Sequence, residues 1–312
     1  MSPSTHTSTS TDDVAIRVSG LEKSYGSVKA VRGLDLEIRR GEIFAILGPN
    51  GAGKTTTIEI LEGYRTRDKG EVSVLGVDPG THRRELKSRV GIVPQTATSD
   101  PFLTVEETLQ MYAGYYSRPR PVDELLDVVG LRDKRSSRVQ RLSGGQQRRL
   151  DVAIALVGDP ELLFLDEPTT GFDPSARHEA WGVVRSLADL GKTVILTTHY
   201  MDEAQHLADR VAVIAAGRVV ALATPDTLGA RDRAVAEIRW RLPDTVSAPT
   251  FIQGDLDDAG YLHHHATDVT RTLFELTRWA LDEGVELEGL QVLRPSLEEV
   301  YLRLIADTEG AS

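Results

Sequence analysis

Two adjacent carboxylates and two glycine-rich helix starts carry the clearest chemistry in this chain. Asp166 and Glu167 directly follow the apolar run LLFL of residues 162–165. Such a run is typical of a buried parallel strand, and open α/β sheets bind their ligands at the carboxyl ends of their strands. A glycine-rich turn that opens a helix leaves backbone N–H groups free to bind an anion. Together these features predict a site for a phosphate compound and a metal ion.

The first glycine-rich turn follows the apolar stretch EIFAIL and reads GPNGAGKTT. It fits the pattern G-x-x-x-x-G-K-[ST] in the strand–loop–helix setting that a phosphate-binding loop requires, which argues against a chance match. Lys54 adds a positive charge near the outer phosphates, and Thr55 offers a hydroxyl to Mg²⁺. The predicted nucleotide-binding residues are Gly48, Pro49, Asn50, Gly51, Ala52, Gly53, Lys54, Thr55 and Thr56.

The second glycine-rich turn lies in the sequence LSGGQQRRL, before the carboxylates. Ser143 stands where a helix N-cap is expected, and Gln146 follows at the spacing of a capping box. Gly144 and Gly145 leave the first backbone N–H groups uncovered, which predicts a second anion-binding helix start. Ser143, Gly144, Gly145 and Gln146 are therefore candidate nucleotide-binding residues.

Two polar side chains are expected at the ends of further parallel strands. Gln95 follows a predicted strand at residues 89–94, and His199 follows one at residues 194–197. An isolated glutamine is usually a surface or capping residue, and a lone histidine after a strand is more often structural than catalytic. His199, however, falls on the same predicted sheet edge as Glu167, which favours a role in the site. Gln95 precedes an irregular stretch and is a candidate for sensing the metal ion or the attacking water.

Two more residues are candidate nucleotide contacts. Tyr25 precedes Gly26, and it is either a turn tyrosine packed on a sheet edge or an aromatic platform for a purine base. Asp173 is the expected N-cap of a helix whose first residue is Pro174. Asp166, with Thr55 and Gln95, completes the predicted metal-binding set.

Composition excludes several other classes of protein. The chain has 312 residues, a net charge of −11 and no cysteine, so clustered basic contacts to nucleic acid, disulfides and zinc–cysteine sites are not expected. No apolar run approaches the roughly 20 residues that span a bilayer. Residues 1–13 are rich in Ser and Thr, lack the features of a secretory signal and are expected to be disordered. A cytoplasmic location fits these features.

The predicted fold class is α/β, with a nucleotide-binding core sheet, an antiparallel β subdomain, a helical insertion and a small C-terminal α+β domain. The first domain is expected at residues 14–224, with antiparallel strands at 14–18 and 34–38 and a helical insertion at about 98–157, of which 119–142 should be mostly helical. Further expected strands lie at residues 42–47, 71–75, 162–165, 211–214 and 218–222.

The C-terminal domain is expected at residues 225–312 and shows no active-site pattern. Its predicted strands are residues 235–242, 261–265 and 285–293, and its predicted helices are residues 267–282 and 296–305. Three consecutive histidines, His263, His264 and His265, suggest a metal site. Side chains alternate between the two faces of a strand, however, so the three cannot face one ion and a structural role is favoured.

Residues 14–224 resemble the nucleotide-binding subunit of an ABC transporter, with a P-loop NTPase core. The motifs occur in the family's order: the aromatic loop at Tyr25, the P-loop, the glutamine loop at Gln95, the LSGGQ signature, the LLFLDE strand, the turn loop at Asp173 and the switch His199. Phe172 departs from the leucine of many members. The tail RPSLEEVYLRL at residues 294–304 is similar to that of daunorubicin-type drug-export ATPases, which pair with a separate permease.

The resemblance implies an ATPase that uses ATP and Mg²⁺ and works as a homodimer. One chain has two anion-binding helix starts but only one aromatic platform and one P-loop lysine, which also favours two copies arranged head to tail. In the family's mechanism Glu167 polarises the attacking water, Lys54 and His199 contact phosphate, and Gln95 connects the site to the insertion. The expected partner is an integral-membrane permease, with this subunit peripheral on the cytoplasmic face of the membrane.

Three alternatives remain open at this point. The first is an ABC ATPase acting on ribosomes or DNA, which the single domain, the acidic charge and the absence of a long heptad insertion disfavour. The second is a drug-sequestering or regulatory protein with slow ATP turnover. The third is an importer ATPase, and the tail resemblance favours export instead.

Overall fold

The computed structural model describes residues 13–95, 99–233, 235–243, 246, 248–252, 254–257 and 259–310. The chain divides into two compact units. The first unit ends at Pro225 and takes in the chain again from Leu304, and the second runs from Asp226 to Arg303. Among the described residues, no helix is both long enough and apolar enough to cross a membrane.

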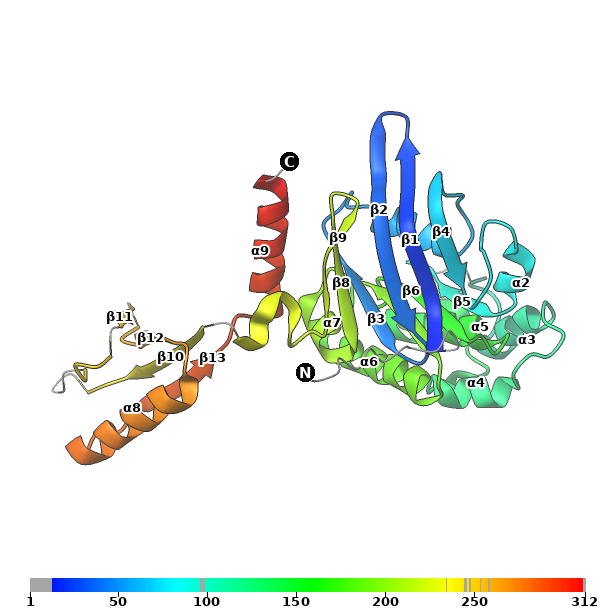
Figure 1. The fold of residues 1–312 in the computed structure, drawn as a ribbon. Helices are drawn as coiled ribbons and strands as arrows, with labels where there is room; N and C mark the ends of the chain where they lie inside the picture. The colour runs from blue at the N-terminus through cyan, green and yellow to red at the C-terminus, as the bar shows by residue number, and fades with distance from the viewer. Residues whose placement is uncertain are drawn as a thin grey trace, which may run out of the picture. The chain divides into compact units, whose positions relative to one another are not determined.

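A six-stranded sheet forms the centre of the first unit, in the order β5-β6-β7-β3-β8-β9 (Figure 1). The first five strands in that order are parallel, and β9 pairs antiparallel with β8. The carboxyl ends of β3, β5, β6 and β7 therefore lie on one edge, as the α/β prediction required. The strands are β3 (Ile43–Leu47), β5 (Val90–Val93), β6 (Leu162–Asp166), β7 (Thr193–Thr197), β8 (Arg210–Ala215) and β9 (Arg218–Ala223).

A second sheet is antiparallel, with the order β2-β1-β4. Its strands are β1 (Val14–Tyr25), β2 (Val28–Arg39) and β4 (Lys69–Val74). The prediction of two short strands at 14–18 and 34–38 was wrong in length. The hairpin continues because several register shifts let the polar residues 22–24 stay paired with β2.

The two sheets share one hydrophobic core with helix α1 (Lys54–Leu61). Alternate residues of the central strands face this core, among them Phe44 and Ile46 of β3 and Phe164 of β6. Ile58 and Leu61 of α1 belong to the same cluster. Because α1 begins inside the phosphate-binding turn, this packing fixes the direction in which the turn presents its backbone N–H groups.

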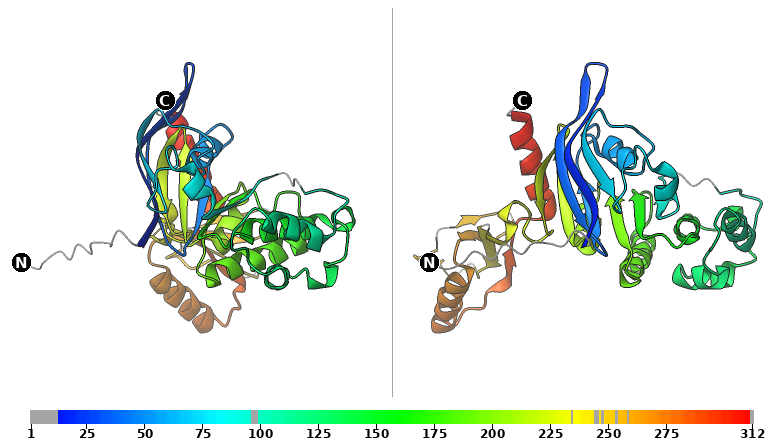
Figure 2. Two further views of the ribbon diagram at one scale, coloured as in Figure 1. Left: turned by 90° about the vertical axis from the view of Figure 1, so that its right-hand side faces the viewer. Right: turned by 45° about the vertical axis from the view of Figure 1, so that its right-hand side comes forward.

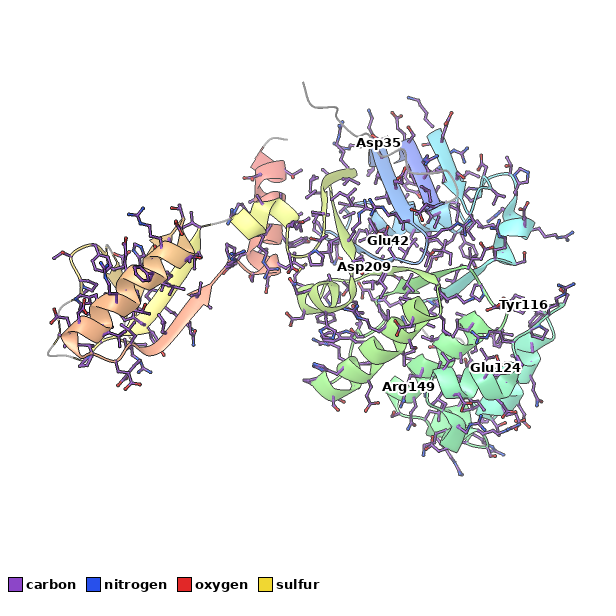
Figure 3. The ribbon with its side chains drawn as sticks, turned by 60° about the horizontal axis from the view of Figure 1, so that its bottom comes forward. Asp35, Glu42, Tyr116, Glu124, Arg149 and Asp209 are labelled. Atoms are coloured by element: carbon purple, nitrogen blue, oxygen red, sulfur yellow. The ribbon has the colours of Figure 1, made fainter. Side chains whose placement is uncertain are left out.

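The start of β3 is tied to the segment before β8. Oδ2 of Asp209 accepts a hydrogen bond of 2.8 Å from the backbone N–H of Ile43. Glu42 accepts bonds from the backbone N–H of Arg39 and from the guanidinium of Arg210, and Figure 3 labels Glu42 and Asp209 in this region. Burial nonetheless raises the pKa of Glu42, and Arg39 and Arg210 counter that shift. These contacts hold β3 in register at the sheet edge opposite the predicted site.

The predicted insertion lies between β5 and β6 and is helical. It contains α3 (Val105–Ala113), α4 (Val122–Val128) and α5 (Gly144–Leu156), and α5 packs against β5 (Figure 2). The segment 119–142 is less helical than predicted. It holds α4 and two short 3₁₀ turns, Arg132–Lys134 and Val139–Arg141, because Gly130 adopts a left-handed conformation after α4 and ends the helical path.

Three further helices complete the first unit. Helix α6 (Pro174–Asp189) begins as predicted, with Asp173 as its N-cap accepting from the backbone N–H of Ala176. Sequence reasoning did not identify α2 (Arg83–Lys87) or α7 (Met201–Leu207). Both are short, so they contain too few turns to show a helical periodicity.

The second unit is an α+β structure, as expected. Its sheet has the order β11-β12-β10-β13, and α8 (Val269–Glu283) covers the face formed by Ile238 and Trp240. The strands are β10 (Ala236–Arg241), β11 (Asp255–Leu256), β12 (Leu262–Ala266) and β13 (Glu288–Leu293). The prediction missed the two-residue strand β11 and began β13 too early, because Val285 still bonds to the last turn of α8. Helix α9 (Leu297–Gly310) begins in this unit.

His263 lies between two carboxylates in the second unit. Its Nδ1 contacts Glu237, and its Nε2 lies 2.9 Å from Oδ2 of Asp257. Hydrogen bonds to Asp257 and then to Glu237 raise the pKa of His263, and the same contact lowers the pKa of Asp257. The described residues contain no group of three or more His, Cys, Asp or Glu side chains able to hold a metal. The sequence favoured a structural role for these histidines, and the contacts of His263 with Glu237 and Asp257 are compatible with that prediction.

This contact predicts a pH-dependent stability of the second unit. The folded pKa of His263 exceeds the ordinary value of 6.5, so the stabilisation is complete below that pH and is lost as the pH rises through the folded pKa. We expect His263→Gln to lower the free energy of unfolding more at about pH 6 than at about pH 9. Urea denaturation monitored by hydrogen exchange in β12 measures the difference. An equal loss at both pH values would contradict the assignment.

Candidate functional site

The predicted carboxylates lie at the carboxyl end of β6. Asp166 is the last residue of the strand, and its carboxylate accepts a hydrogen bond from the hydroxyl of Thr197 on β7. The backbone N–H of Glu167 bonds to the carbonyl of Thr197 at 3.1 Å. Glu167 has a φ of 45°, in the left-handed region that is costly for a residue with a side chain. The turn therefore directs Glu167 away from the strand and over the sheet edge.

Glu167, Gln95 and His199 come together as predicted. Nε2 of Gln95 donates to Oε2 of Glu167 at 2.9 Å, and Nδ1 of His199 lies 3.3 Å from Oε1. Thr170 adds a hydroxyl bond of 3.1 Å to Oε2. Strands β5, β6 and β7 each supply one of the three side chains, so the parallel sheet alone explains their meeting. The cluster can hold a water or a phosphate oxygen beside a carboxylate.

The phosphate-binding turn, residues 48–56, connects β3 to α1. Nζ of Lys54 folds back on the turn and donates to the carbonyls of Gly48 at 2.7 Å and Pro49 at 3.0 Å. Burial lowers the pKa of Lys54, and Glu167 and then Asp166 act in the opposite direction. The ammonium group therefore lies in the field of both carboxylates.

Gly53 shows why this turn needs glycine. Its φ is 103°, and a Cβ atom at this position would lie 2.4 Å from the carbonyl oxygen of Ala30. No side chain can be accommodated there without moving the backbone of β2. The close approach therefore requires glycine at this position of the turn.

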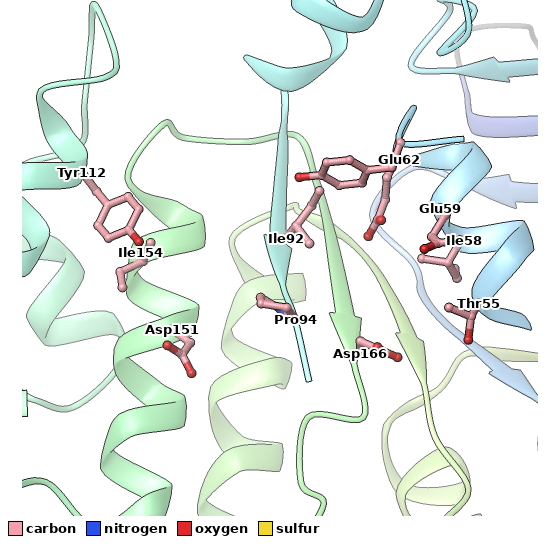
Figure 4. A pocket seen from close by; sticks show the side chains of 11 residues that line it. Thr55, Ile58, Glu59, Glu62, Ile92, Pro94, Tyr112, Asp151, Ile154 and Asp166 are labelled. Atoms are coloured by element: carbon pink, nitrogen blue, oxygen red, sulfur yellow. The ribbon is translucent and has the colours of Figure 1, made fainter. Parts of the chain in front are cut away.

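A cavity of 460 Å³ opens beside the turn, between α1 and α5 (Figure 4). Thr55 and Asp166 both line it, and in Figure 4 the carboxylate of Asp166 points toward α1. A hydroxyl and a carboxylate are hard oxygen ligands of the kind that Mg²⁺ takes together with substrate phosphates. The residues present therefore fit a magnesium–nucleotide complex. Gln95 does not line this cavity; its amide is bonded to Glu167 instead.

The same cavity contains carboxyl groups that sequence reasoning missed. Glu62 and Asp151 face it, and both are buried. Burial, together with the charges of Asp166 and Glu59, raises the pKa of Glu62 to about 8. Burial raises the pKa of Asp151 to about 6, and Arg148 opposes that shift. Glu62 directly follows α1 and Asp151 lies within α5, and an acidic residue in either place is usually exposed, so only the fold reveals that these groups are buried.

Glu62 gives a second pH-dependent prediction. Its folded pKa of about 8 lies above the ordinary 4.5, so the folded state loses stability as the pH rises between these two values. We expect Glu62→Gln to increase the free energy of unfolding relative to the wild type, with a gain that grows from about pH 5 to about pH 8. Urea denaturation without nucleotide at both pH values measures this gain. An equal gain in the free energy of unfolding at both pH values would show that Glu62 is already ionised in the folded protein at about pH 5.

The signature turn, the LSGGQ segment of residues 142–146, has the predicted capping box at the start of α5. Oγ of Ser143 accepts from the backbone N–H of Gln146 at 3.3 Å, and Oε1 of Gln146 accepts from the backbone N–H of Ser143 at 3.0 Å. Ser143 and Gly144 are exposed, and a Cβ atom on Gly144 would meet nothing within 4 Å. The start of α5 is therefore exposed at Ser143 and Gly144 and partly buried at Gly145, while the backbone N–H of Gln146 is bonded within the capping box. This helix start is available to an anion that approaches from outside the chain.

Arg148 is a buried residue of α5 that sequence reasoning did not single out. Its guanidinium donates to three backbone carbonyls, those of Pro94 after β5, Asp166 at the end of β6, and Pro168. A buried cation is costly unless its donors are satisfied, and these carbonyls satisfy it. The helix that starts at the signature turn is therefore joined to the ends of the strands that carry Gln95 and Glu167.

Glu203 on α7 is also buried and was not predicted. Its Oε1 accepts from the hydroxyl of Thr169 at 2.9 Å and from Nε1 of Trp181 at 3.3 Å. Burial raises the pKa of Glu203, and hydrogen bonds from Thr198, Thr169 and Trp181 oppose the shift. These bonds connect the turn after Glu167 to the segment after His199.

The two remaining predicted contacts lie at the edges of the site. Tyr25 is the last residue of β1 and is 40% exposed, so its ring is open to a ligand. Asp173 is exposed and caps α6 through Oδ1. Gly145 of the signature turn lies near α6, since a Cβ atom there would be 3.7 Å from Cβ of Ala176.

Comparison with known proteins identifies the family. Residues 31–170 match the ABC transporter family, and residues 236–296 match the C-terminal domain of ABC transporter domain-containing-like proteins. The chain is 40% identical to the daunorubicin resistance ATP-binding protein DrrA2 of Streptomyces coeruleorubidus, over 94% of this chain and 95% of that protein. It is 42% identical to the Nod factor export ATP-binding protein I of Paraburkholderia xenovorans, over 94% and 97% of the two chains.

Solved structures share the architecture of the first unit. The structure of cbiO1 from Clostridium perfringens, part of the ABC transporter complex cbiONQ, matches with a TM-score of 0.63 and 29% identity, over 69% of this chain and 90% of that one. The ATP-binding cassette MJ0796, in a dimeric post-hydrolysis state with ADP and Pi, matches with a TM-score of 0.59 and 25% identity, over 67% and 98%. The chain therefore belongs to the ABC transporter family, as an ATP-hydrolysing ATP-binding subunit, and the predicted fold class and family are confirmed.

Proposed function

We propose that this chain binds and hydrolyses ATP to power the export of a drug or another hydrophobic compound through a separate membrane permease. The proposal is supported by the side chains that meet at the candidate site, taken together with the names of the chain's relatives. Gln95, Glu167 and His199 meet at the sheet edge beside the P-loop, and relatives aligned over 94% of the chain are named for drug resistance and export. The subunit would lie on the cytoplasmic face of the membrane, held there by the permease.

In the proposed mechanism the P-loop binds the phosphates of ATP. Lys54 leaves its bonds to the turn carbonyls and neutralises phosphate charge, together with the backbone N–H groups of residues 48–56. Tyr25 stacks on the base. Thr55 and Asp166 would hold Mg²⁺, which when bound would supply positive charge to the phosphates. Phosphoryl transfer requires mainly positioning and electrostatic stabilisation, and these residues supply both.

The attacking water is assigned to Glu167. Its carboxylate accepts the water's hydrogen bond and polarises it, while His199 contacts the γ-phosphate. Gln95 donates a hydrogen bond to Glu167, so it is positioned to sense the water or the metal and to relay this to the helical insertion. The family resemblance suggests these three roles, and the meeting of the three side chains at one sheet edge supports them.

We assign Ser143, Gly144, Gly145 and Gln146 to the nucleotide of a second copy. The helix start at Ser143 is exposed, and a helix N-terminus contributes about 0.3–1 kcal/mol to anion binding, up to about 2 kcal/mol when partly buried. Two copies arranged head to tail would hold two ATP molecules between them, with Asp173 near the same interface. The dimeric cassette MJ0796 supports such an arrangement.

Transport by the reconstituted pair tests the function. The chain should co-purify with a polytopic permease, and inside-out vesicles with both proteins should accumulate daunorubicin when ATP and Mg²⁺ are added. Vesicles with Glu167→Gln in place of the wild type should not. ATP-dependent release of the compound from the vesicle lumen would indicate import. Full ATPase activity without any membrane partner, combined with ribosome or DNA binding, would favour the other class of ABC ATPase.

A further inference from the structure

Two cations lie against the ring of Tyr25. The guanidinium carbon of Arg65 is 5.3 Å from the ring centroid, and Nζ of Lys23 is 5.7 Å from it. Both distances are within the roughly 6 Å at which a cation is attracted by the face of an aromatic ring. Nothing in the sequence motif around Tyr25 indicates the Arg65 contact, because Arg65 follows α1, 40 positions later in the chain.

Arg65 is fixed by Glu59, a residue of α1. Nε and Nη2 of Arg65 both donate to the carboxylate of Glu59, and the backbone N–H of Arg65 donates to the Glu59 carbonyl at 3.0 Å. A planar guanidinium held by two parallel bonds has a defined orientation. The helix that begins at Lys54 thus reaches the ring of Tyr25 through the pair Glu59–Arg65.

Lys23 differs from Arg65 in what holds it. Its Nζ donates to Oδ1 of Asp68 at 2.7 Å, and Oδ2 of Asp68 accepts from the backbone N–H of Ser24 at the same distance. Asp68 in turn donates its backbone N–H to the carbonyl of Glu22. These bonds pin the end of β1 but do not lead to α1. Of these two cations, Arg65 is the one that connects the ring to the helix that follows the P-loop.

We propose that Arg65 is a positioning residue for the nucleobase. It packs on the ring of Tyr25 and fixes the ring relative to Lys54, so that the base stacks on the rest of the exposed ring at the spacing set by the bound phosphates. The inference rests on the proposed role of Tyr25 as the base platform. Stacking depends on overlap with the base, so Arg65 should matter more for a purine nucleotide than for a pyrimidine nucleotide.

The test compares ligands with and without a base. Dissociation constants of ATP, CTP and inorganic tripolyphosphate are measured for the wild type and Arg65→Gln. We expect ATP to bind about 3- to 10-fold more weakly to the variant, CTP to be affected less, and tripolyphosphate to bind equally well. Arg65→Lys keeps the charge but not the paired bonds to Glu59. Its dissociation constant for ATP should lie between those of the wild type and Arg65→Gln. An equal weakening of all three ligands would overturn the proposal, since it would mean that Arg65 acts only through its charge.

A double-mutant cycle with Tyr25→Leu separates the possible failures. In the Tyr25→Leu background, Arg65→Gln should have no further effect on ATP affinity. If Tyr25→Leu leaves ATP affinity unchanged, the base-platform role itself fails. If Tyr25→Leu weakens ATP binding and Arg65→Gln does not, the role of Arg65 alone fails. Arg17→Gln is the matched control, because Arg17 is an exposed, ion-paired residue of the same strand β1 and its loss should leave all three affinities unchanged.

Discussion

Glu167→Gln should lower steady-state ATP hydrolysis by about 10²- to 10⁴-fold, the range that a general base contributes. An amide cannot polarise the attacking water as a carboxylate does. It keeps nearly the same shape, however, and can still bond to Gln95 and Thr170, the partners of the Glu167 carboxylate. ATP binding should therefore survive, and the variant should accumulate as an ATP-bound dimer. Phosphate release measures turnover, and size-exclusion chromatography with ATP and Mg²⁺ measures the dimer.

Glu161→Gln is the control for this variant. Glu161 precedes the same strand β6 at its opposite end, and it pairs with Arg89 and Arg40. Its substitution removes the same charge without reaching the site, so hydrolysis should remain close to that of the wild type. If Glu167→Gln hydrolysed ATP at the wild-type rate, the assignment of Glu167 as the general base would be wrong.

Ser143→Arg should abolish hydrolysis while leaving ATP binding by the P-loop of the same chain intact. The new side chain fills the exposed helix start and removes the capping box with Gln146. Loss of an N-cap costs about 0.5–2 kcal/mol of stability, which a folded domain of this size tolerates. ATP binding followed by fluorescence of a nucleotide analogue, together with phosphate release, separates the two effects. Equal loss of binding would contradict the assignment of Ser143 to the partner's nucleotide.

Mixing two inactive variants tests that assignment directly. Lys54→Ala damages the P-loop and Ser143→Arg damages the signature turn. If each site combines the two elements from different copies, a mixed dimer contains one intact site, and the mixture should recover hydrolysis that neither variant has alone. Ser296→Arg controls for the lost cap, since Ser296 makes the same capping box with Glu299 at the start of α9. No recovery would mean that the elements act within one chain.

The sequence was sufficient to predict most of the site because its geometry follows from topology. Each of Gln95, Glu167 and His199 follows an apolar run that reads as a buried strand, and parallel strands bring their carboxyl ends to one edge. The capping box of Ser143 and Gln146 and the N-cap of Asp173 depend only on local spacing, and both formed as predicted. The family motifs added the functional meaning.

The contacts that the sequence did not reveal are those between distant segments. Arg148 bonds carbonyls that lie 18 to 54 positions away, and a backbone carbonyl has no residue-specific signal. Glu62 at the end of α1 and Glu203 on α7 are acidic residues, a type that is usually exposed, and only the packing of neighbouring elements buries them. The length of the β1–β2 hairpin was missed because polar residues at 22–24 interrupt the apolar alternation that marks a strand.

The bonds of Arg148 have a consequence for the proposed dimer. Because this guanidinium joins α5 to the backbone after β5 and β6, the LSGGQ turn cannot shift far from its own Glu167 without breaking charge-assisted bonds. In the proposed head-to-tail pair, that turn would contact the ATP of the opposite copy. A movement of Glu167 in one copy would then displace the turn that contacts the nucleotide of the other copy. The two hydrolysis events would therefore be coupled rather than independent.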